Sequence, residues 1–297
     1  MEINAASLRS LNTSFNTAYN DGLSGAAASQ WGRIATEVPS TTGENEYGWL
    51  GSFPRMREWL GDRQIQNLST SGYRIKNRKF ELTIGVARDN IEDDNIGIYA
   101  PMFRHMGESV GAEYDTSVWA LLKAGFSTPC YDGQFFFDTD HPVLNEAGQE
   151  VSVVNTDGGA GTPWFLVDDR RVLKPLILQI RKRWKFISLD KETDPGVFMR
   201  DQYTYGVDGR YNVGFGFWQM AWGSKQTLDA TNYANASAAL GNMKGDYGRP
   251  LGIVPRLLIV PQTLASQAKK ILLAENDAAG ATNIHKGSAE LLICPWL

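Results

Sequence analysis

Cysteine and histidine are both scarce in this chain of 297 residues. Only two cysteines occur, Cys130 and Cys294, and they form no CxxC pair. Two cysteines cannot build a disulfide framework, and their scarcity favours a reducing compartment. Three histidines in all provide little material for a metal centre.

Long apolar runs and strong net charge are missing as well. No run of about 18 apolar residues occurs, so we expect no membrane contact. The first residues carry an acid, Glu2, and no apolar core of signal-peptide length. The formal net charge is −4, and the one Lys/Arg-rich run is "RKRWK" at 181–185. Neutralising nucleic-acid phosphates is therefore not the expected main task of the surface, and we expect a soluble cytosolic protein.

The composition that remains is typical of a folded protein. Hydrophobic residues make up 42% of the chain and charged residues 21%. The first 45 residues are an exception: a short amphipathic helix with Leu8, Leu11, Phe15 and Tyr19 on one face is followed by Gly/Ala/Ser-rich and turn-rich sequence. We expect this arm to become ordered by lying against something else, for which a neighbouring subunit is one candidate.

Residues 46–87 predict a long, charged hairpin. Strand signals occur around Ile65 and over 80–86, and "STSG" supplies a turn between them. A hairpin alone is marginal in water, so this one is expected to lean on another element or another chain. The aromatic and basic residues interleaved in it, with the acids that follow, are candidates for contacts between subunits: Trp49, Trp59, Arg63, Arg74, Lys76, Arg78, Glu92, Asp93 and Asp94.

The rest of the chain alternates between helix and strand signals. Apolar positions after Pro101 predict a helix over about 98–124 that ends at Gly125. Strands are expected from 166 to 225, with a tight turn at "VDGR", 207–210. In the last 70 residues two helices and two short buried strands predict a small α/β layer.

Three short motifs could indicate chemistry. The consecutive acids Glu92, Asp93 and Asp94 point apart on any regular element, so they fit the entrance to a helix better than a metal site. The loop "CYDGQFFFDTDHP" could bind a divalent cation through Asp132, Asp138, Asp140 and His141, although its aromatic centre favours a buried loop pinned by Asx-type turns. "GFGFWQ" lacks the third glycine of a dinucleotide fingerprint and reads better as a strand.

Five long blocks of the sequence resemble the Mu-like phage major head subunit family, in the same order over nearly the whole chain. They are "YGWLGSFPRMREWLGDRQIQ", "GVARDNIEDDNIGIYAPMFRHMG", "LLKAGFSTPCYDGQFFFDTDHPV", "GFGFWQMAWGSKQTL" and "RPLGIVPRLLIVPQTLASQAKKILLAE". The resemblance implies an α+β, HK97-like capsid fold. It assigns 1–45 to an N-terminal arm, 46–95 to an extended loop hairpin and its junction, 96–225 to a peripheral domain with a spine helix at 98–124, and 226–297 to an axial domain.

The same resemblance implies a function. The chain would be a major capsid protein that assembles with itself into the pentamers and hexamers of an icosahedral head enclosing double-stranded DNA, without sequence-specific DNA contact. It would be part of the virion, assembled in the host cytoplasm with scaffold, portal and decoration proteins as partners, with no cofactor and no enzymatic role. Basic residues of the hairpin, such as Arg74 and Lys76, could pair with Glu92, Asp93 and Asp94 of an adjacent subunit. The alternatives are another phage structural protein, such as a tail or decoration subunit, and a metal-dependent hydrolase using Asp132, Asp138, Asp140 and His141.

Overall fold

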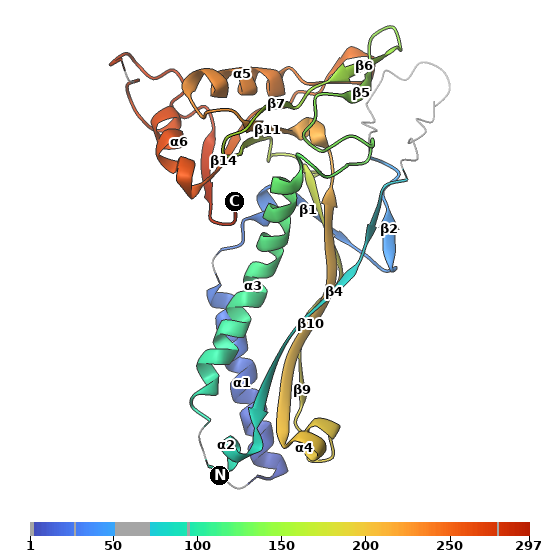
Figure 1. The fold of residues 1–297 in the computed structure, drawn as a ribbon, viewed down its shortest axis with the longest axis vertical. Helices are drawn as coiled ribbons and strands as arrows, with labels where there is room; N and C mark the ends of the chain where they lie inside the picture. Colours follow the sequence, from blue (N-terminus) through green and yellow to red (C-terminus); the bar gives the residue numbers. More distant parts are fainter. Residues whose placement is uncertain (1–2, 27, 51–71, 94–95, 278) are drawn as a thin grey trace.

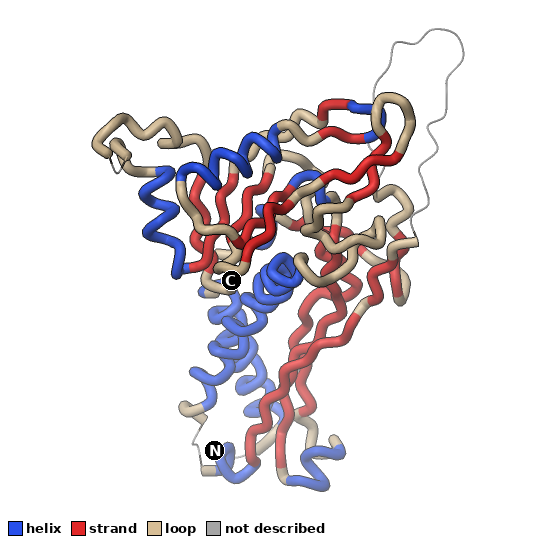
Figure 2. Tube along the Cα trace, turned by 45° about the horizontal axis from the view of Figure 1, so that its top comes forward, coloured by secondary structure: helices blue, strands red, loops and turns tan. Residues whose placement is uncertain are grey.

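The molecule consists of a long narrow stem and a broader body at one end of it (Figure 1). This computed structural model describes residues 3–26, 28–50, 72–93, 96–277 and 279–297. Helices and a long sheet form the stem, and a second sheet with its own helices forms the body (Figure 2).

Two helices run side by side along the stem. The first, α1 (Ala5–Gly25), begins at a capping box between Asn4 and Ser7 and buries the predicted apolar face. The predicted helix is thus confirmed, and it packs against α3 (Tyr99–Ala124) of the same chain. Phe15 of α1 stacks on Phe103 of α3, with ring centroids 4.3 Å apart. The arm is therefore ordered by a contact within its own chain.

The longer helix, α3, matches the helix predicted over 98–124. Pro101 lies in its first turn and Gly125 is its C-cap. At 1.5 Å per residue its 26 residues span roughly 40 Å. Glycines allow the two helices to approach closely, because a Cβ atom on Gly107 would collide with the backbone oxygen of Tyr19.

A four-stranded sheet lies alongside the helix pair, in the order β1-β9-β10-β4. The strands are β1 (Ala35–Pro39), β9 (Leu176–Leu189), β10 (Gln202–Phe215) and β4 (Arg78–Ala87). The strand expected over 80–86 is confirmed as part of β4, but it pairs with β10. The segment around Ile65, expected to be its partner, lies outside the described residues.

The tight turn predicted at "VDGR" is wrong. Strand β10 runs straight through Val207–Arg210 because it is paired on both sides, with β4 and with β9. The glycine marks an irregularity instead: the register with β9 shifts between Asp208 and Tyr211. Here Gly209 lies under the indole ring of Trp184, where a Cβ atom would collide.

The five-stranded sheet of the body has the order β15-β14-β8-β11-β7. Helices α5 (Ala230–Gly241) and α6 (Ala265–Leu272) pack against it. Both are predicted by the sequence, as are the parallel strands β14 (Leu257–Pro261) and β15 (Glu290–Cys294). The sheet also includes β7 (Thr156–Gly159), β8 (Trp164–Val167) and β11 (Ala221–Lys225), so it draws strands from both sides of the domain edge predicted at 225.

Smaller elements complete the chain. Two short helices, α2 (Arg88–Glu92) and α4 (Pro195–Arg200), lie at the far end of the stem (Figure 1). The small antiparallel pairs are β2 (Glu44–Glu46) with β3 (Arg74–Lys76), β5 (His141–Leu144) with β6 (Glu150–Val153), and β12 (Lys244–Gly245) with β13 (Arg249–Pro250). Single 3₁₀ turns are η1 (Trp31–Arg33), η2 (Trp218–Met220), η3 (Asp246–Gly248) and η4 (Gln262–Leu264).

Two hydrophobic cores hold the molecule together. The larger core fills the body and reaches the upper part of the stem, and the smaller one lies between α1, α3 and the lower half of the long sheet. Trp184 on β9 packs against both. Among the described residues, no helix is long and apolar enough to cross a bilayer.

Candidate functional site

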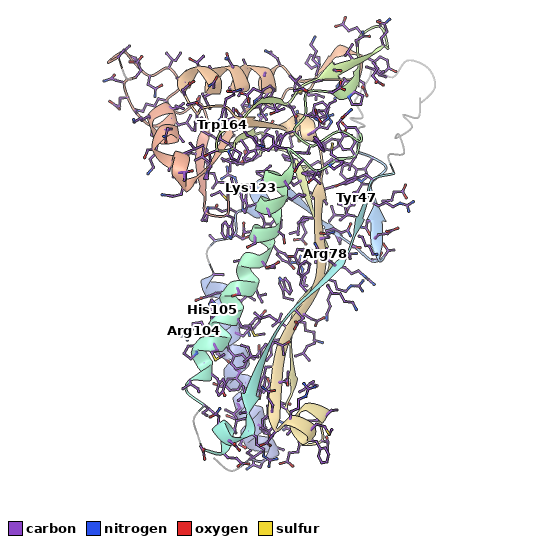
Figure 3. The ribbon with its side chains drawn as sticks, viewed as in Figure 1. Tyr47, Arg78, Arg104, His105, Lys123 and Trp164 are labelled. Carbon is purple, nitrogen blue, oxygen red and sulfur yellow. The ribbon has the colours of Figure 1, made fainter. Side chains whose placement is uncertain are left out.

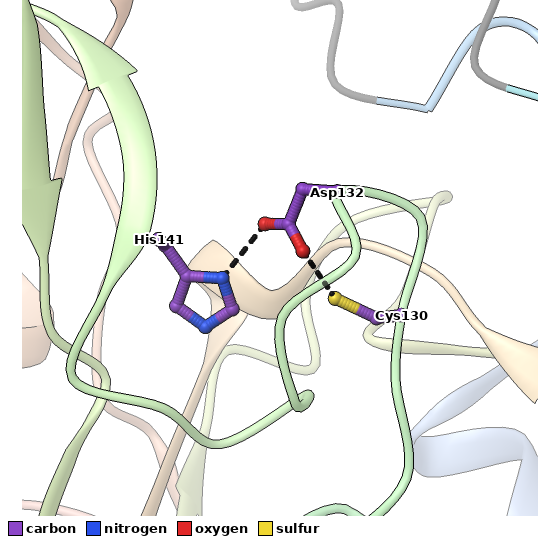
Figure 4. Close-up of side chains that lie close together, drawn as sticks. All are labelled: Cys130, Asp132 and His141. Carbon is purple, nitrogen blue, oxygen red and sulfur yellow. Dashed lines mark hydrogen bonds and ion pairs between the residues drawn. The ribbon is translucent and has the colours of Figure 1, made fainter.

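The loop 130–141 brings three of its chemically capable side chains together (Figure 4). The thiol of Cys130 donates to Asp132 Oδ1 at 3.0 Å, and His141 Nδ1 lies 2.7 Å from Asp132 Oδ2. The His141 side chain is fully buried, and that of Asp132 is nearly so. The structure therefore brings together Asp132 and His141, two of the four residues that the sequence analysis named as candidates for binding a divalent cation.

Hydrogen bonds hold the His141 ring in place. Asn155 offers it an oxygen, because Asn155 Oδ1 also accepts from the Asp138 backbone and its Nδ2 donates to the carbonyl of Phe136. The other ring nitrogen faces the Asp132 carboxylate. Both ring nitrogens therefore face oxygen atoms of neighbouring side chains, which fixes the orientation of the ring. The ring also stacks on Trp218, with ring centroids 3.9 Å apart.

The pKa of the Cys130 thiol is raised, whereas the pKa of the Asp132 carboxyl is lowered. Burial, helped by the neighbouring Asp132 carboxylate, raises the pKa of the Cys130 thiol, so Cys130 is a poor nucleophile. Burial opposes ionisation of Asp132 too, but hydrogen bonds from His141 and Cys130 outweigh it and lower the pKa of that carboxyl. Asp132 is thus a buried carboxylate held by hydrogen bonds, and the thiol beside it stays protonated.

The remaining acids of the loop do not join the cluster. Asp138 accepts from the backbone N–H groups of Phe135 and Thr139, and Asp140 pairs with Ser152 on β6. Among the described residues, Cys130, Asp132 and His141 form the one group of three that brings its ligand atoms within 4.8 Å of one another. Three protein ligands with a water as the fourth are enough for a tetrahedral zinc site, so this cluster is the candidate metal site of the described part of the chain. In the structure its side chains hydrogen-bond to one another instead, and the Asx turn from Asp132 to the Gln134 N–H agrees with a pinned loop.

The acidic stretch 89–94 forms the junction between strand and helix. It begins within α2, directly after β4, and precedes α3 in the chain. Asp89 lies in the first turn of α2, and Glu92 pairs with Arg88 at 2.9 Å. Asp93 is exposed, while Asp94 lies outside the described residues. His105 points outward from α3 and lies 3.6 Å from Glu108 (Figure 3).

The described basic contact candidates divide into two groups. Arg74 already pairs with Glu44 and Glu46 across the β2–β3 pair. Lys76 and Arg78 are exposed. Arg78 lies well up the stem while α2 lies at its far end, so pairing with the acidic stretch requires two chains (Figures 1 and 3).

The aromatic candidates are less available. Trp49 is half-buried and packs against Phe217, with ring centroids 5.6 Å apart, so it belongs in part to the core of its own chain. Trp59 and Arg63 lie outside the described residues.

Two features escaped the sequence analysis. Buried Asp115 on α3 accepts from the backbone N–H groups of Gln30 and Trp31 and thereby fixes the segment after α1. The sequence indicates this contact only by an acidic residue within the apolar face of the predicted helix. At the end of the stem, Phe198 and Met199 on α4 are strongly exposed. Their signal is an apolar "VFM" within a polar turn.

Comparison with known proteins gives one consistent result. Residues 8–297 match the family model described as Mu-like prophage major head subunit gpT. The chain is 40% identical over 306 residues to the major capsid protein of Escherichia phage Mu, covering 100% of both chains. It is 44% identical over 301 residues to the Mu-like prophage FluMu major head subunit of Haemophilus influenzae, covering 98% of this chain and 97% of the relative.

Solved structures agree with the family match. The chain resembles the subunit in the procapsid of bacteriophage JBD30 with a TM-score of 0.87 and 47% identity, over 99% of this chain and 100% of that one. It resembles the JBD30 capsid subunit with a TM-score of 0.76 and 35% identity, over 91% of each chain.

Proposed function

This chain belongs to the Mu-like prophage major head subunit family and is a major capsid protein with an HK97-like, α+β fold, and we propose that it assembles into the pentamers and hexamers of an icosahedral head around double-stranded DNA. Assembly would take place in the host cytoplasm with scaffold and portal proteins. A decorated JBD30 capsid, whose subunit is similar to this chain, carries minor capsid protein trimers, which supports a decoration protein as a further partner.

The observation that carries the proposal is the shape of the subunit. The narrow stem has a small core of its own, and two strand edges of its sheet are open among the described strands. Among the described strands, β4 pairs with β10 alone, and β9 pairs only with β10 beyond Ile180. Charged side chains such as Lys79, Arg181 and Lys185 keep these edges soluble until copies of the chain meet.

The domain assignments extend the proposal. Residues 1–45 would be the arm, with α1 stored along α3, and 46–87 would include the extended loop that reaches across a neighbouring subunit. The stem, with its spine helix α3, would be the peripheral domain. The five-stranded sheet with α5 and α6 would be the axial domain, so 156–167 and 221–225 belong with 226–297.

Electron microscopy tests this function. The purified chain, alone and co-expressed with its neighbouring head genes, is examined in negative stain. Rings of five or six or closed shells are expected. A uniform monomer or dimer under both conditions would count against it.

The pairing of basic hairpin residues with the acidic stretch of an adjacent subunit remains a prediction. Arg74 has partners within the chain, so Lys76 is the better test. Charge reversal, Lys76→Glu, should lower particle yield, and Asp93→Lys in the same chain should restore it. Unchanged yield in Lys76→Glu would remove the pairing.

A further inference from the structure

The side chains of Cys130, Asp132 and His141 offer one sulfur, one oxygen and one nitrogen as ligand atoms (Figure 4). These atoms all lie within 4.8 Å of one another. Ligand atoms of a single zinc ion lie about 3 to 4 Å apart, because zinc–sulfur and zinc–nitrogen bonds measure roughly 2.3 and 2.0 Å. Small movements of the three side chains therefore suffice to place their ligand atoms around one ion.

The kinds of donor atom indicate which metal fits. Calcium and magnesium are bound by oxygen ligands, and Asp132 supplies the one carboxylate of this group. Asp138 accepts from backbone N–H groups and Asp140 pairs with Ser152, so both carboxylates are used elsewhere. Thiolate and imidazole ligands together suit zinc. The cluster is thus selective for a soft divalent ion.

The orientation of the His141 ring matches that of a metal ligand. Its Nδ1 lies 2.7 Å from Asp132 Oδ2, and its Nε2 lies 3.2 Å from Asn155 Oδ1. The Asn155 amide is fixed in turn, because its Nδ2 donates to the Phe136 carbonyl and its Oδ1 accepts from the Asp138 N–H. A histidine that binds a metal usually donates its second ring N–H to such an oxygen, and its first nitrogen then faces the ion.

Backbone contacts hold the three ligands in place. The Cys130 N–H donates to the Gln134 carbonyl at 2.8 Å, and the Gln134 N–H donates to Asp132 Oδ1 at 3.1 Å. His141 begins β5, where it pairs with Val153 of β6. Asp132 is the least buried of the three ligands, so a water can approach the ion from its side. The site is therefore largely formed before an ion arrives, which lowers the cost of binding.

We propose that Cys130, Asp132 and His141 bind one zinc ion, with a water as the fourth ligand. The ion displaces the thiol proton, which passes to solvent, and Cys130 binds as a thiolate. Bound zinc fastens the loop 130–141 to the start of β5 and stabilises the body. All three ligands belong to one chain, so this inference goes beyond the proposed function and does not depend on assembly.

Metal analysis of the purified full chain tests the site. The protein is produced in medium supplemented with zinc, purified without chelator and examined by mass spectrometry of the elements. One zinc ion per chain is expected, and Cys130→Ser should lose it. Cys294→Ser is the matched control, because Cys294 is the other buried cysteine and lies outside the cluster, and it should keep the zinc.

Cobalt(II) substitution identifies the ligands without relying on a variant. Cobalt bound by a thiolate absorbs in the near ultraviolet through sulfur-to-metal charge transfer, and tetrahedral cobalt has intense visible bands. Both absorptions are expected when cobalt is added to the unsubstituted chain and to Cys294→Ser, and neither in Cys130→Ser. The unsubstituted chain alone decides the question if Cys130→Ser does not fold.

A chelator measures the stabilising role. Removing zinc should lower the thermal midpoint of the unsubstituted chain and leave that of Cys130→Ser unchanged, since an ion that binds the folded state stabilises it.

Three results would overturn the inference. A chain without zinc that gives no charge-transfer band on cobalt addition would leave the cluster as a hydrogen-bonded group only. Zinc that Cys130→Ser retains in full would be an adventitious ion elsewhere. Loss of zinc without a change in the thermal midpoint would contradict the stabilising role.

Discussion

Single residues in this subunit show how buried charge serves architecture. His141 and Asp132 resemble a catalytic pair by spacing, yet each is bonded to groups that hold it still, Asn155 and Trp218 on one side and Cys130 on the other. Neither is open to a substrate, because the imidazole is fully buried. Through its contacts with Asn155 and Trp218, the pair joins the loop 130–141 to the start of β7 and to η2.

Removing the His141 imidazole should therefore act on stability. His141→Ala leaves the buried Asp132 carboxylate without its hydrogen-bond partner, which is expected to cost about 3 kcal/mol in the free energy of unfolding. His105→Ala, on the exposed face of α3, is the control and should change it by less than about 0.5 kcal/mol. Denaturant titration measures both; equal effects would contradict a structural role of the His141–Asp132 contact.

Acid sensitivity should come in part from Asp168, at the end of β8. Burial opposes its ionisation, but hydrogen bonds from Arg170 and the Val254 backbone outweigh it and lower the pKa of this carboxyl below its ordinary 3.8. A lowered pKa gives stability that is present above pH 3.8 and is lost as the pH falls through the folded-state pKa. Asp168→Asn should cost about 2 kcal/mol at pH 7 and have a smaller effect below pH 3. Urea midpoints across this range measure it, and a pH-independent loss would contradict the assignment.

At the scale of elements, the helix pair depends on backbone contact as much as on side chains. The close approach of α1 and α3 at Gly107 leaves no room for a methyl group beside the Tyr19 carbonyl. Rigid backbone on both sides cannot yield as a flexible side chain would.

Gly107→Ala should consequently destabilise the subunit, by about 2 kcal/mol, although alanine is the better helix former. Gly25→Ala in α1 is the matched control, since no atom lies within 4 Å of its added Cβ, and it should leave stability unchanged or slightly raised. Thermal unfolding of the two variants gives the comparison. Equal losses of stability in both would contradict the crossing at Gly107 as the cause.

Elements with strong local signals were predictable from the sequence, and partners across the chain were not. The face Leu8, Leu11, Phe15 and Tyr19 defines α1, but nothing in it names Phe103 as its partner. "VDGR" has turn chemistry, yet strands on both sides keep it extended. The Cys130–Asp132–His141 cluster was predictable as a loop but not in its hydrogen bonds, because Asn155 is contributed from outside the loop.

At the scale of the whole molecule, two cores of unequal size imply unequal stability. The body core includes both faces of a five-stranded sheet, whereas the stem core depends on two helices against one face of three strands. Local opening should therefore start in the stem.

Hydrogen exchange can measure this difference. In the free subunit, amides of Tyr203–Val207 should exchange faster than those of Leu257–Val260 in the body. In assembled particles the stem amides should become protected, because neighbouring copies cover them. Stem amides that exchange as slowly as the body in the free subunit would contradict the order of opening.

The register shift beside Gly209 has a consequence for geometry. It lies where β9 and β10 pass from one core to the other, under the one indole ring, Trp184, that belongs to both. A bulge bends and twists a strand locally without breaking its pairing on either side. The direction of the long sheet therefore changes at a defined height on the stem, between the segment over the larger core and the segment over the smaller one.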